Sequence, residues 1–301
     1  SGGNITGRRY SFRGTWSDVN GKGTKTLEYS TDGGSSWNPV SVAPPNVNKN
    51  AVPQVTAEAS WTANIDVSEQ ENFKIQFRAA DGAGLQTESI EYTGIKFDFS
   101  VPTITPLEAK VNTTPTDTDV AGKYVNNAMQ GKTLTVKATV TDNFSLGSDD
   151  ATVKANITAT VKHNGTPYSG LTITKTPSPD KKSADAIFSF MIPNDGTKDG
   201  AWTFTVKVKD AAGREAATEK SVGVTVDTVA PTWKTDGTAN KAPYISPENI
   251  GGWYNRTSLL IKATAEDNSG GSGIDKLQYK LSDSSNWNDV GNGNFTFTCS
   301  D

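Results

Sequence analysis

The chain has 301 residues, and its 29 Lys and Arg against 33 Asp and Glu give a formal net charge of −4. This mild acidity argues against nucleic acid and anionic membranes as partners, since both attract a basic face. No apolar run approaches the roughly 18 residues of a membrane helix, so no membrane insertion is expected in this segment. Hydrophobic residues make up only 34% of the chain, which predicts two or three domains with thin cores.

Alternation of apolar and polar residues is the main secondary-structure signal. In chain order it runs through residues 73–79, 134–140 and 202–208. Alternation of this kind gives a strand one buried and one wet face, as in an antiparallel sheet packed against a second sheet. No stretch shows a sustained helical period. The sequence therefore predicts an all-β fold.

Internal repeats indicate how the strands are organised. Residues 12–18 align with residues 136–142 and again with residues 261–267, a period of about 125 residues. Residues 98–102 recur at 227–231, where Pro resists continued sheet pairing and marks a junction. A unit of this length with about seven short strands is typical of an immunoglobulin-like sandwich. We expect tandem immunoglobulin-like antiparallel β-sandwiches joined by short linkers.

The repeat spacing predicts three domains. The first covers residues 1–99 and lacks its first strand, the second covers residues 100–228 and is complete, and the third covers residues 229–301 and lacks its last strands. Two explanations for the missing strands stay open. Either the chain is part of a longer polypeptide, or strands of a neighbouring molecule complete it head to tail.

Four segments carry a resemblance to a known family: residues 210–213, 226–232, 252–255 and 266–270. They resemble tandem bacterial immunoglobulin-like (Big-type) repeats, which occur in extracellular surface proteins and adhesins and as accessory modules of secreted carbohydrate-active enzymes. The middle unit departs from the pattern, since a hairpin over residues 161–173 is expected in place of the hairpin that carries a Trp.

The resemblance implies a non-enzymatic stalk segment of a bacterial cell-surface or secreted adhesin-like protein. Its partners would be neighbouring immunoglobulin-like domains of the same or another chain, and a glycan or a host or cell-surface protein as ligand. Two alternatives remain: accessory, carbohydrate-binding modules of a secreted polysaccharide-active enzyme, and a strand-complemented filament or surface-layer subunit.

Residues for enzymatic chemistry are scarce. The single Cys299 excludes an intrachain disulfide, and the single His163 precedes an Asn-Gly turn, where an exposed histidine is the expected outcome. Residues 30–37 fit the Ser-x-Asp-x-Gly-x-Ser-Trp box of sialidase propellers, in which the Asp braces a hairpin and the Trp packs beneath it. We expect no catalytic residue and no enzyme.

The seven Trp residues divide into two groups. Four recur at one place in the repeat or share the inward register of their strand, so they are expected in sandwich cores: Trp16, Trp37, Trp202 and Trp287. The other three are candidates for contact with a glycan: Trp61, Trp233 and Trp253.

Acidic residues gather where the chain enters and leaves a sandwich. Asp142 and Asn143 follow one strand of the second unit, Asp210 follows another, and Asp98 ends the preceding unit. The same positions of the next junction are taken by three further residues: Asp227, Asp267 and Asn268. Ca²⁺ binds six to eight oxygens of this chemistry. The sequence therefore suggests interdomain calcium sites, although each Asp would equally suit the cap of its own turn.

Overall fold

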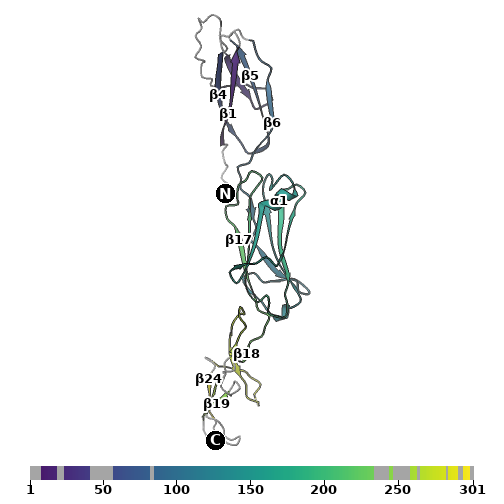
Figure 1. Cartoon of the computed structure of the whole chain (residues 1–301), viewed down its shortest axis with the longest axis vertical. Helices are drawn as coiled ribbons and strands as arrows, with labels where there is room; N and C mark the ends of the chain where they lie inside the picture. The colour runs from purple at the N-terminus through teal and green to yellow at the C-terminus, as the bar shows by residue number, and fades with distance from the viewer. Residues whose placement is uncertain are drawn as a thin grey trace. The chain divides into compact units, whose positions relative to one another are not determined.

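A computed structural model describes most of the chain. It covers residues 8–18, 24–40, 57–81, 85–233, 244–246, 258–262, 265–282, 284–290 and 294–298. The chain divides into two compact units, Ser1–Ser100 and Val101–Asp301, and in the described residues nearly all the regular elements of both are strands (Figure 1). The predicted all-β fold is confirmed, while the immunoglobulin-like topology and the three-domain division stay predictions. None of the helices in the described residues is long and apolar enough to cross a membrane.

The described residues of the first unit form two sheets. Its strands are β1 (Arg8–Asp18), β2 (Thr24–Ser30), β3 (Asn38–Pro39), β4 (Ala57–Val67), β5 (Gln70–Asp81) and β6 (Ile90–Phe97). β1 pairs with β4, and the other four form a sheet in the order β3-β2-β5-β6. Alternate residues of both sheets bury one shared core, which includes Ile65, Ile75 and Phe97. The alternation predicted at residues 73–79 is therefore the inward face of β5.

The larger sandwich of the second unit spans thirteen elements, from Thr103 to Val226. They are β7 (Thr103–Ile104), β8 (Glu108–Val111), β9 (Thr118–Asp119), β10 (Tyr124–Val125), η1 (Asn127–Met129), β11 (Thr133–Thr141), α1 (Asp150–Asn156), β12 (Ile157–His163), β13 (Thr166–Pro167), β14 (Thr172–Pro177), β15 (Ser183–Met191), β16 (Gly200–Val208) and β17 (Lys220–Val226). One sheet has the order β10-β17-β16-β12-β13 and the other β14-β15-β11-β8-β9, with β7 also paired to β11.

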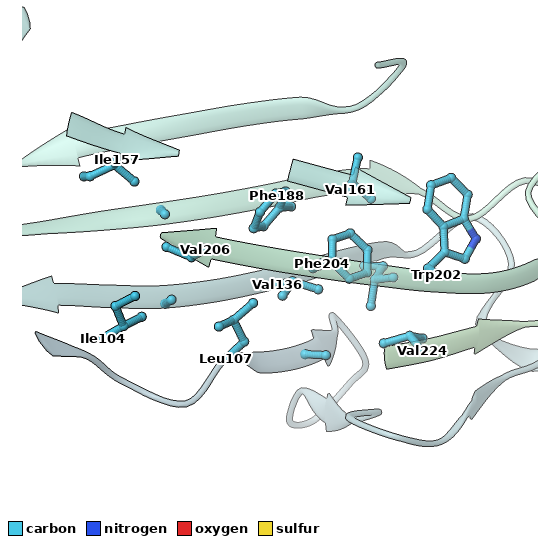
Figure 2. Packing of buried hydrophobic residues seen from close by; sticks show 14 of the residues in the cluster. Ile104, Leu107, Val136, Ile157, Val161, Phe188, Trp202, Phe204, Val206 and Val224 are labelled. Carbon is cyan, nitrogen blue, oxygen red and sulfur yellow. The ribbon is translucent and has the colours of Figure 1, made fainter. Parts of the chain in front are cut away.

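The core of this sandwich is filled by β-branched and aromatic residues from both sheets. Trp202, Phe204 and Val206 of β16 share one buried cluster with Phe188 of β15 and Val136 of β11 (Figure 2). All five side chains are at most 1% exposed. The alternation predicted at residues 134–140 and 202–208 thus marks two facing strands.

The expected hairpin over residues 161–173 is only half right. Asn164 and Gly165, with φ of 50° and 77°, form the tight turn that joins β12 to β13. The chain then leaves this sheet, because β14 pairs with β15 and brings Ile173 opposite Phe188. A crossover between the two sheets therefore replaces the second half of the hairpin.

The remaining strands of the second unit are short. They are β18 (Thr232–Trp233), β19 (Tyr244–Ser246), β20 (Ser258–Lys262), β21 (Ala265–Glu266), β22 (Leu277–Tyr279), β23 (Asn288–Val290) and β24 (Asn294–Thr298). β18 pairs with β21, β20 lies between β19 and β24, and β22 pairs with β23, all antiparallel.

The Trp predictions have mixed outcomes. Trp202 is 1% exposed, which confirms its place in the core, whereas Trp287 is 60% exposed and its core assignment is wrong. Trp37 is only half-buried, because it packs under a turn rather than between sheets. Trp233 is 50% exposed and Trp61 half-buried. The predictions for the side chains of Trp16 and Trp253 lie outside the described residues.

Candidate metal centre

Asp142 directly follows β11 and is 8% exposed. Its Oδ1 accepts hydrogen bonds from the backbone N–H groups of Phe144 (2.8 Å) and Ser145 (2.9 Å), so this oxygen caps its own turn. Its Oδ2 is buried and has no hydrogen-bond partner among the described residues. One half of the carboxylate is therefore used structurally, and the other half is available to a ligand.

Asp210 repeats this arrangement after the end of β16. Its Oδ1 accepts a hydrogen bond from the backbone N–H of Arg214 at 2.8 Å, and its side chain is 1% exposed. Its Oδ2, like that of Asp142, is buried without a hydrogen-bond partner in the part of the chain that the structure describes. Burying an unpaired carboxylate oxygen is costly unless a cation or a proton compensates its charge.

Carboxylate oxygens of Asp142 and Asp210 lie within 4.8 Å of each other. Two buried carboxylates at this separation repel each other, and a hard cation between them would relieve both the repulsion and the missing contacts. The backbone oxygen of the adjacent Asn143 accepts a hydrogen bond from Lys182 Nζ at 3.0 Å. Asp98 follows β6 in the other unit, so its participation stays a prediction.

The second predicted junction forms a hydrogen-bonded loop. Asp227 Oδ2 accepts the backbone N–H of Ser272 at 2.8 Å, and Asp267 Oδ2 accepts that of Gly273 at 2.7 Å. Two adjacent amides therefore tie both aspartates to one loop. Asp227 Oδ1 and Asn268 Oδ1 remain buried without hydrogen-bond partners among the described residues. Neither side chain is as deeply buried as Asp210, so this second centre is the weaker candidate.

Asp199 is a buried, hydrogen-bonded carboxylate that the sequence did not single out. It is 3% exposed and accepts hydrogen bonds from the backbone N–H of Thr228 at 3.0 Å, from Thr228 Oγ1 at 2.8 Å and from Asn268 Nδ2 at 2.8 Å. It stands directly before β16 and holds the backbone just beyond β17. We call a residue in this position an exit carboxylate.

Glu69 is the exit carboxylate of the first unit. It stands directly before β5, and its Oε1 accepts the backbone N–H groups of Phe99 (2.8 Å) and Ser100 (2.6 Å), just beyond β6. Its Oε2 also accepts a hydrogen bond from Ser100 Oγ at 3.0 Å. In each unit, a carboxylate directly before one strand therefore fixes the backbone just beyond the next strand of the same sheet.

His163 is not the exposed turn residue that the sequence predicted. It is half-buried at the end of β12, where its ring stacks on Trp202 with centroids 4.2 Å apart. Its Nε2 lies 2.8 Å from the backbone oxygen of Asp199. The turn begins at Asn164, so His163 still belongs to β12, and its ring lies beside Trp202 of the neighbouring strand β16. The His163 ring therefore contributes to packing.

The box at residues 30–37 braces a turn, as predicted. Asp32 Oδ1 accepts the backbone N–H of Ser36 (2.9 Å) and the hydroxyl of Ser30 (2.7 Å), and Oδ2 accepts the Ser36 hydroxyl (2.5 Å). Trp37 Nε1 donates to the backbone oxygen of Gly34 at 3.0 Å, and the Arg78 guanidinium lies 4.0 Å from the Trp37 ring centre.

The hydrogen bonds around Asp32 make this turn sensitive to acid. Three hydrogen bonds lower the pKa of Asp32 from 3.8 to about 2. The largest effect comes from the Ser36 hydroxyl, followed by the Ser36 backbone N–H and the Ser30 hydroxyl. Because the folded pKa lies below the ordinary value, the turn is fully stabilised above about pH 3.8 and loses this contribution as the pH falls through about 2.

A titration of Asp32 followed by carboxyl ¹³C NMR should show a midpoint at about pH 2. Ser36→Ala should raise the pKa and Ser35→Ala should barely change it; equal midpoints would contradict the assignment.

Searches against protein-family models and against curated proteins found no match for this chain.

Proposed function

We propose that this chain is a non-enzymatic structural segment of a bacterial extracellular or cell-surface protein, built of tandem immunoglobulin-like sandwiches. The observation that carries the proposal is the exit carboxylate, which occurs in both units. Glu69 and Asp199 each bind the backbone directly after the last strand of a sandwich. A stalk needs this kind of device, because its linkers must leave each module in a fixed direction.

The strand pairing recurs with the sequence spacing, which supports a tandem arrangement. Tyr29 pairs with Asn38, and 250 residues later Tyr279 pairs with Asn288. A second recurrence has a spacing of 129 residues, since the isolated bridge between positions 80 and 86 reappears between positions 209 and 215. Register is set by the hydrophobic pattern and the turn, so equal registers favour modules of one kind.

Calcium bound at Asp142 and Asp210 is part of this proposal. The ion would neutralise both buried carboxylates and contact the two oxygens that lack partners. Asn143 is the further donor within this unit that the sequence predicts. Thr103, near the start of the unit, pairs with Thr141, the residue before Asp142. A calcium ion here would therefore bind beside the entry of the chain into the second unit and stiffen it.

The calcium proposal predicts a metal-dependent melting temperature. Binding to the native state at about one hundred times the Kd adds about 2.7 kcal/mol of stability. Calorimetry should therefore show a higher melting temperature in CaCl₂ than after chelation, and small-angle scattering should show a broader shape distribution after chelation. Asp210→Asn should abolish the calcium response.

The matched control is Asp195→Asn, which changes an exposed aspartate whose Oδ1 accepts hydrogen bonds from Thr197. This variant should keep the full calcium response. Identical melting and scattering with calcium and with chelator would contradict the metal site. It would leave the structural role to the exit carboxylates alone.

A further inference from the structure

The two aspartates of the candidate metal centre come from opposite sheets of the sandwich in the second unit. Asp142 follows β11 and Asp210 follows β16, and these two strands belong to different sheets. The distance between the two carboxylates therefore depends on how the sheets are held together at this end. The loops that carry the aspartates are linked there by a side chain and by a backbone hydrogen bond.

The linking side chain is that of Asn156, the last residue of α1. Its Nδ2 donates hydrogen bonds to the backbone oxygen of Leu146 at 2.7 Å and to that of Asp210 at 3.3 Å. Leu146 lies four residues after Asp142 in the same loop, so one carboxamide binds both aspartate loops. A carboxamide nitrogen has two hydrogens to donate, and these two bonds use both.

The backbone link lies directly beside this side chain. The N–H of Ala211 donates to the backbone oxygen of Ser145 at 2.9 Å, one residue along from each of the two oxygens that Asn156 binds. The first loop also packs tightly on α1, because a Cβ on Gly147 would lie only 2.7 Å from the backbone nitrogen of Val153. The two loops and the end of α1 therefore form one connected structure.

Asn156 is itself fixed relative to both sheets. On either side of it, Lys154 and Ile157 offer backbone oxygens that accept hydrogen bonds from Lys175 Nζ, at 2.9 Å and 2.5 Å. Lys175 belongs to β14, in the sheet of β11, whereas Ile157 begins β12, in the sheet of β16. The carboxamide of Asn156 is thus held at a point where the two sheets are already tied together.

We propose that calcium acts here as a clasp between the two sheets, and that Asn156 is the positioning residue that sets the separation of Asp142 and Asp210. The inference rests on the proposed calcium site and adds what the ion does there: it bridges the sheets and keeps this end of the sandwich closed. Both donors of Asn156 go to the backbone, so it acts through the aspartate loops. Groups that orient metal ligands in this way typically change metal affinity by about 10- to 100-fold.

Asn156→Asp tests the positioning role, because it keeps the size of the side chain and removes both donors. Titration of the full chain with CaCl₂ in a calorimeter should show calcium binding that is weaker by about tenfold or more. An added negative charge near the ion would by itself tighten binding, so the direction of the change separates positioning from charge. Asn156→Gln keeps the carboxamide on a longer side chain and should lose less affinity.

Asn164→Asp is the matched control. It makes the same chemical change at the other end of β12, roughly 25 Å away along the strand. The Oδ1 of Asn164 accepts the backbone N–H of Ala201 at 2.9 Å, and an aspartate can still accept this bond. The variant should therefore bind calcium as tightly as the wild-type chain.

Hydrogen exchange at Ala211 measures the clasp separately from calcium affinity. Calcium should slow exchange of this amide in the wild-type chain about tenfold or more, because opening of the two loops would break the ion's contacts. With chelator present, Asn156→Asp should speed the same exchange about tenfold, which tests the link between the loops without the ion. The amide of Asn164, bonded to Ala201 at the far end of β12, should change in neither experiment.

The outcomes distinguish the clasp from the calcium site on which it rests. Equal calcium affinity in Asn156→Asp and the wild-type chain would overturn the positioning role and leave the calcium site intact. Calcium binding that leaves exchange at Ala211 unchanged would overturn the clasp alone. Absence of calcium binding by the wild-type chain would overturn the clasp together with the calcium site.

Discussion

Replacing Trp202 by alanine is expected to destabilise the second unit by about 3–5 kcal/mol. The indole is 1% exposed, stacks on His163, and donates a hydrogen bond from Nε1 to the backbone oxygen of Lys198 at 2.8 Å. Its removal leaves a cavity and an unpaired carbonyl at one end of the core. Denaturant unfolding, followed by amide signals of β16, measures the loss.

Trp287→Ala is the matched control for this prediction. Its ring is 60% exposed and lies 5.4 Å from Lys280 Nζ, so its removal should change the free energy of unfolding by no more than about 0.5 kcal/mol. Equal losses in the two variants would contradict the exposures of the two rings and would return Trp287 to a core.

Asp199→Ala is the second change with a large expected effect. It removes the acceptor for the backbone N–H and hydroxyl of Thr228 and for Asn268 Nδ2. A buried donor left without a partner costs about 1–3 kcal/mol, and hydrogen bonds to a charged group are among the stronger ones. We expect a loss of about 2–4 kcal/mol in the free energy of unfolding, together with faster hydrogen exchange at Thr228.

Thr228→Val separates the two parts of this effect. It deletes the hydroxyl but keeps the backbone N–H bonded to Asp199, so its cost should be clearly smaller than that of Asp199→Ala. Asp195→Ala, at an exposed aspartate of the same loop, should have little effect on exchange at Thr228. If the Thr228 amide exchanges at the same rate in all three variants, the exit carboxylate does not hold the backbone at this residue.

Much of the fold could be read from the sequence, because period-two alternation reports directly which residues face a core. It located the inward residues of β11 and β16 and grouped Asp142 with Asp210, since both follow strands that end at one pole. Whether each aspartate caps its turn or offers a free oxygen could not be decided from the sequence. In both residues Oδ1 caps the turn, and Oδ2 has no hydrogen-bond partner among the described residues.

The errors have identifiable physical causes. Trp287 recurs at the position of Trp37, but Ser282 replaces the aspartate that braces the turn in the first unit, so the recurrence does not preserve the environment of the ring. Asp199 was missed because it lies in a Gly- and Asp-rich stretch that reads as an ordinary loop. Only the folded chain brings Thr228, 29 residues away in the sequence, against it.

In the proposed stalk, the exit carboxylate would also determine how tension enters a module. A pull on the linker at Thr228 would otherwise peel β17 from β16, starting at the terminal pair of Gly200 and Val226. Asp199 binds the chain on the pulling side of that pair. The load therefore passes sideways into β16, the central strand of its sheet, before the first pair can open. Deleting this one carboxyl group would change a joint loaded in shear into one whose strand pairs open one after another.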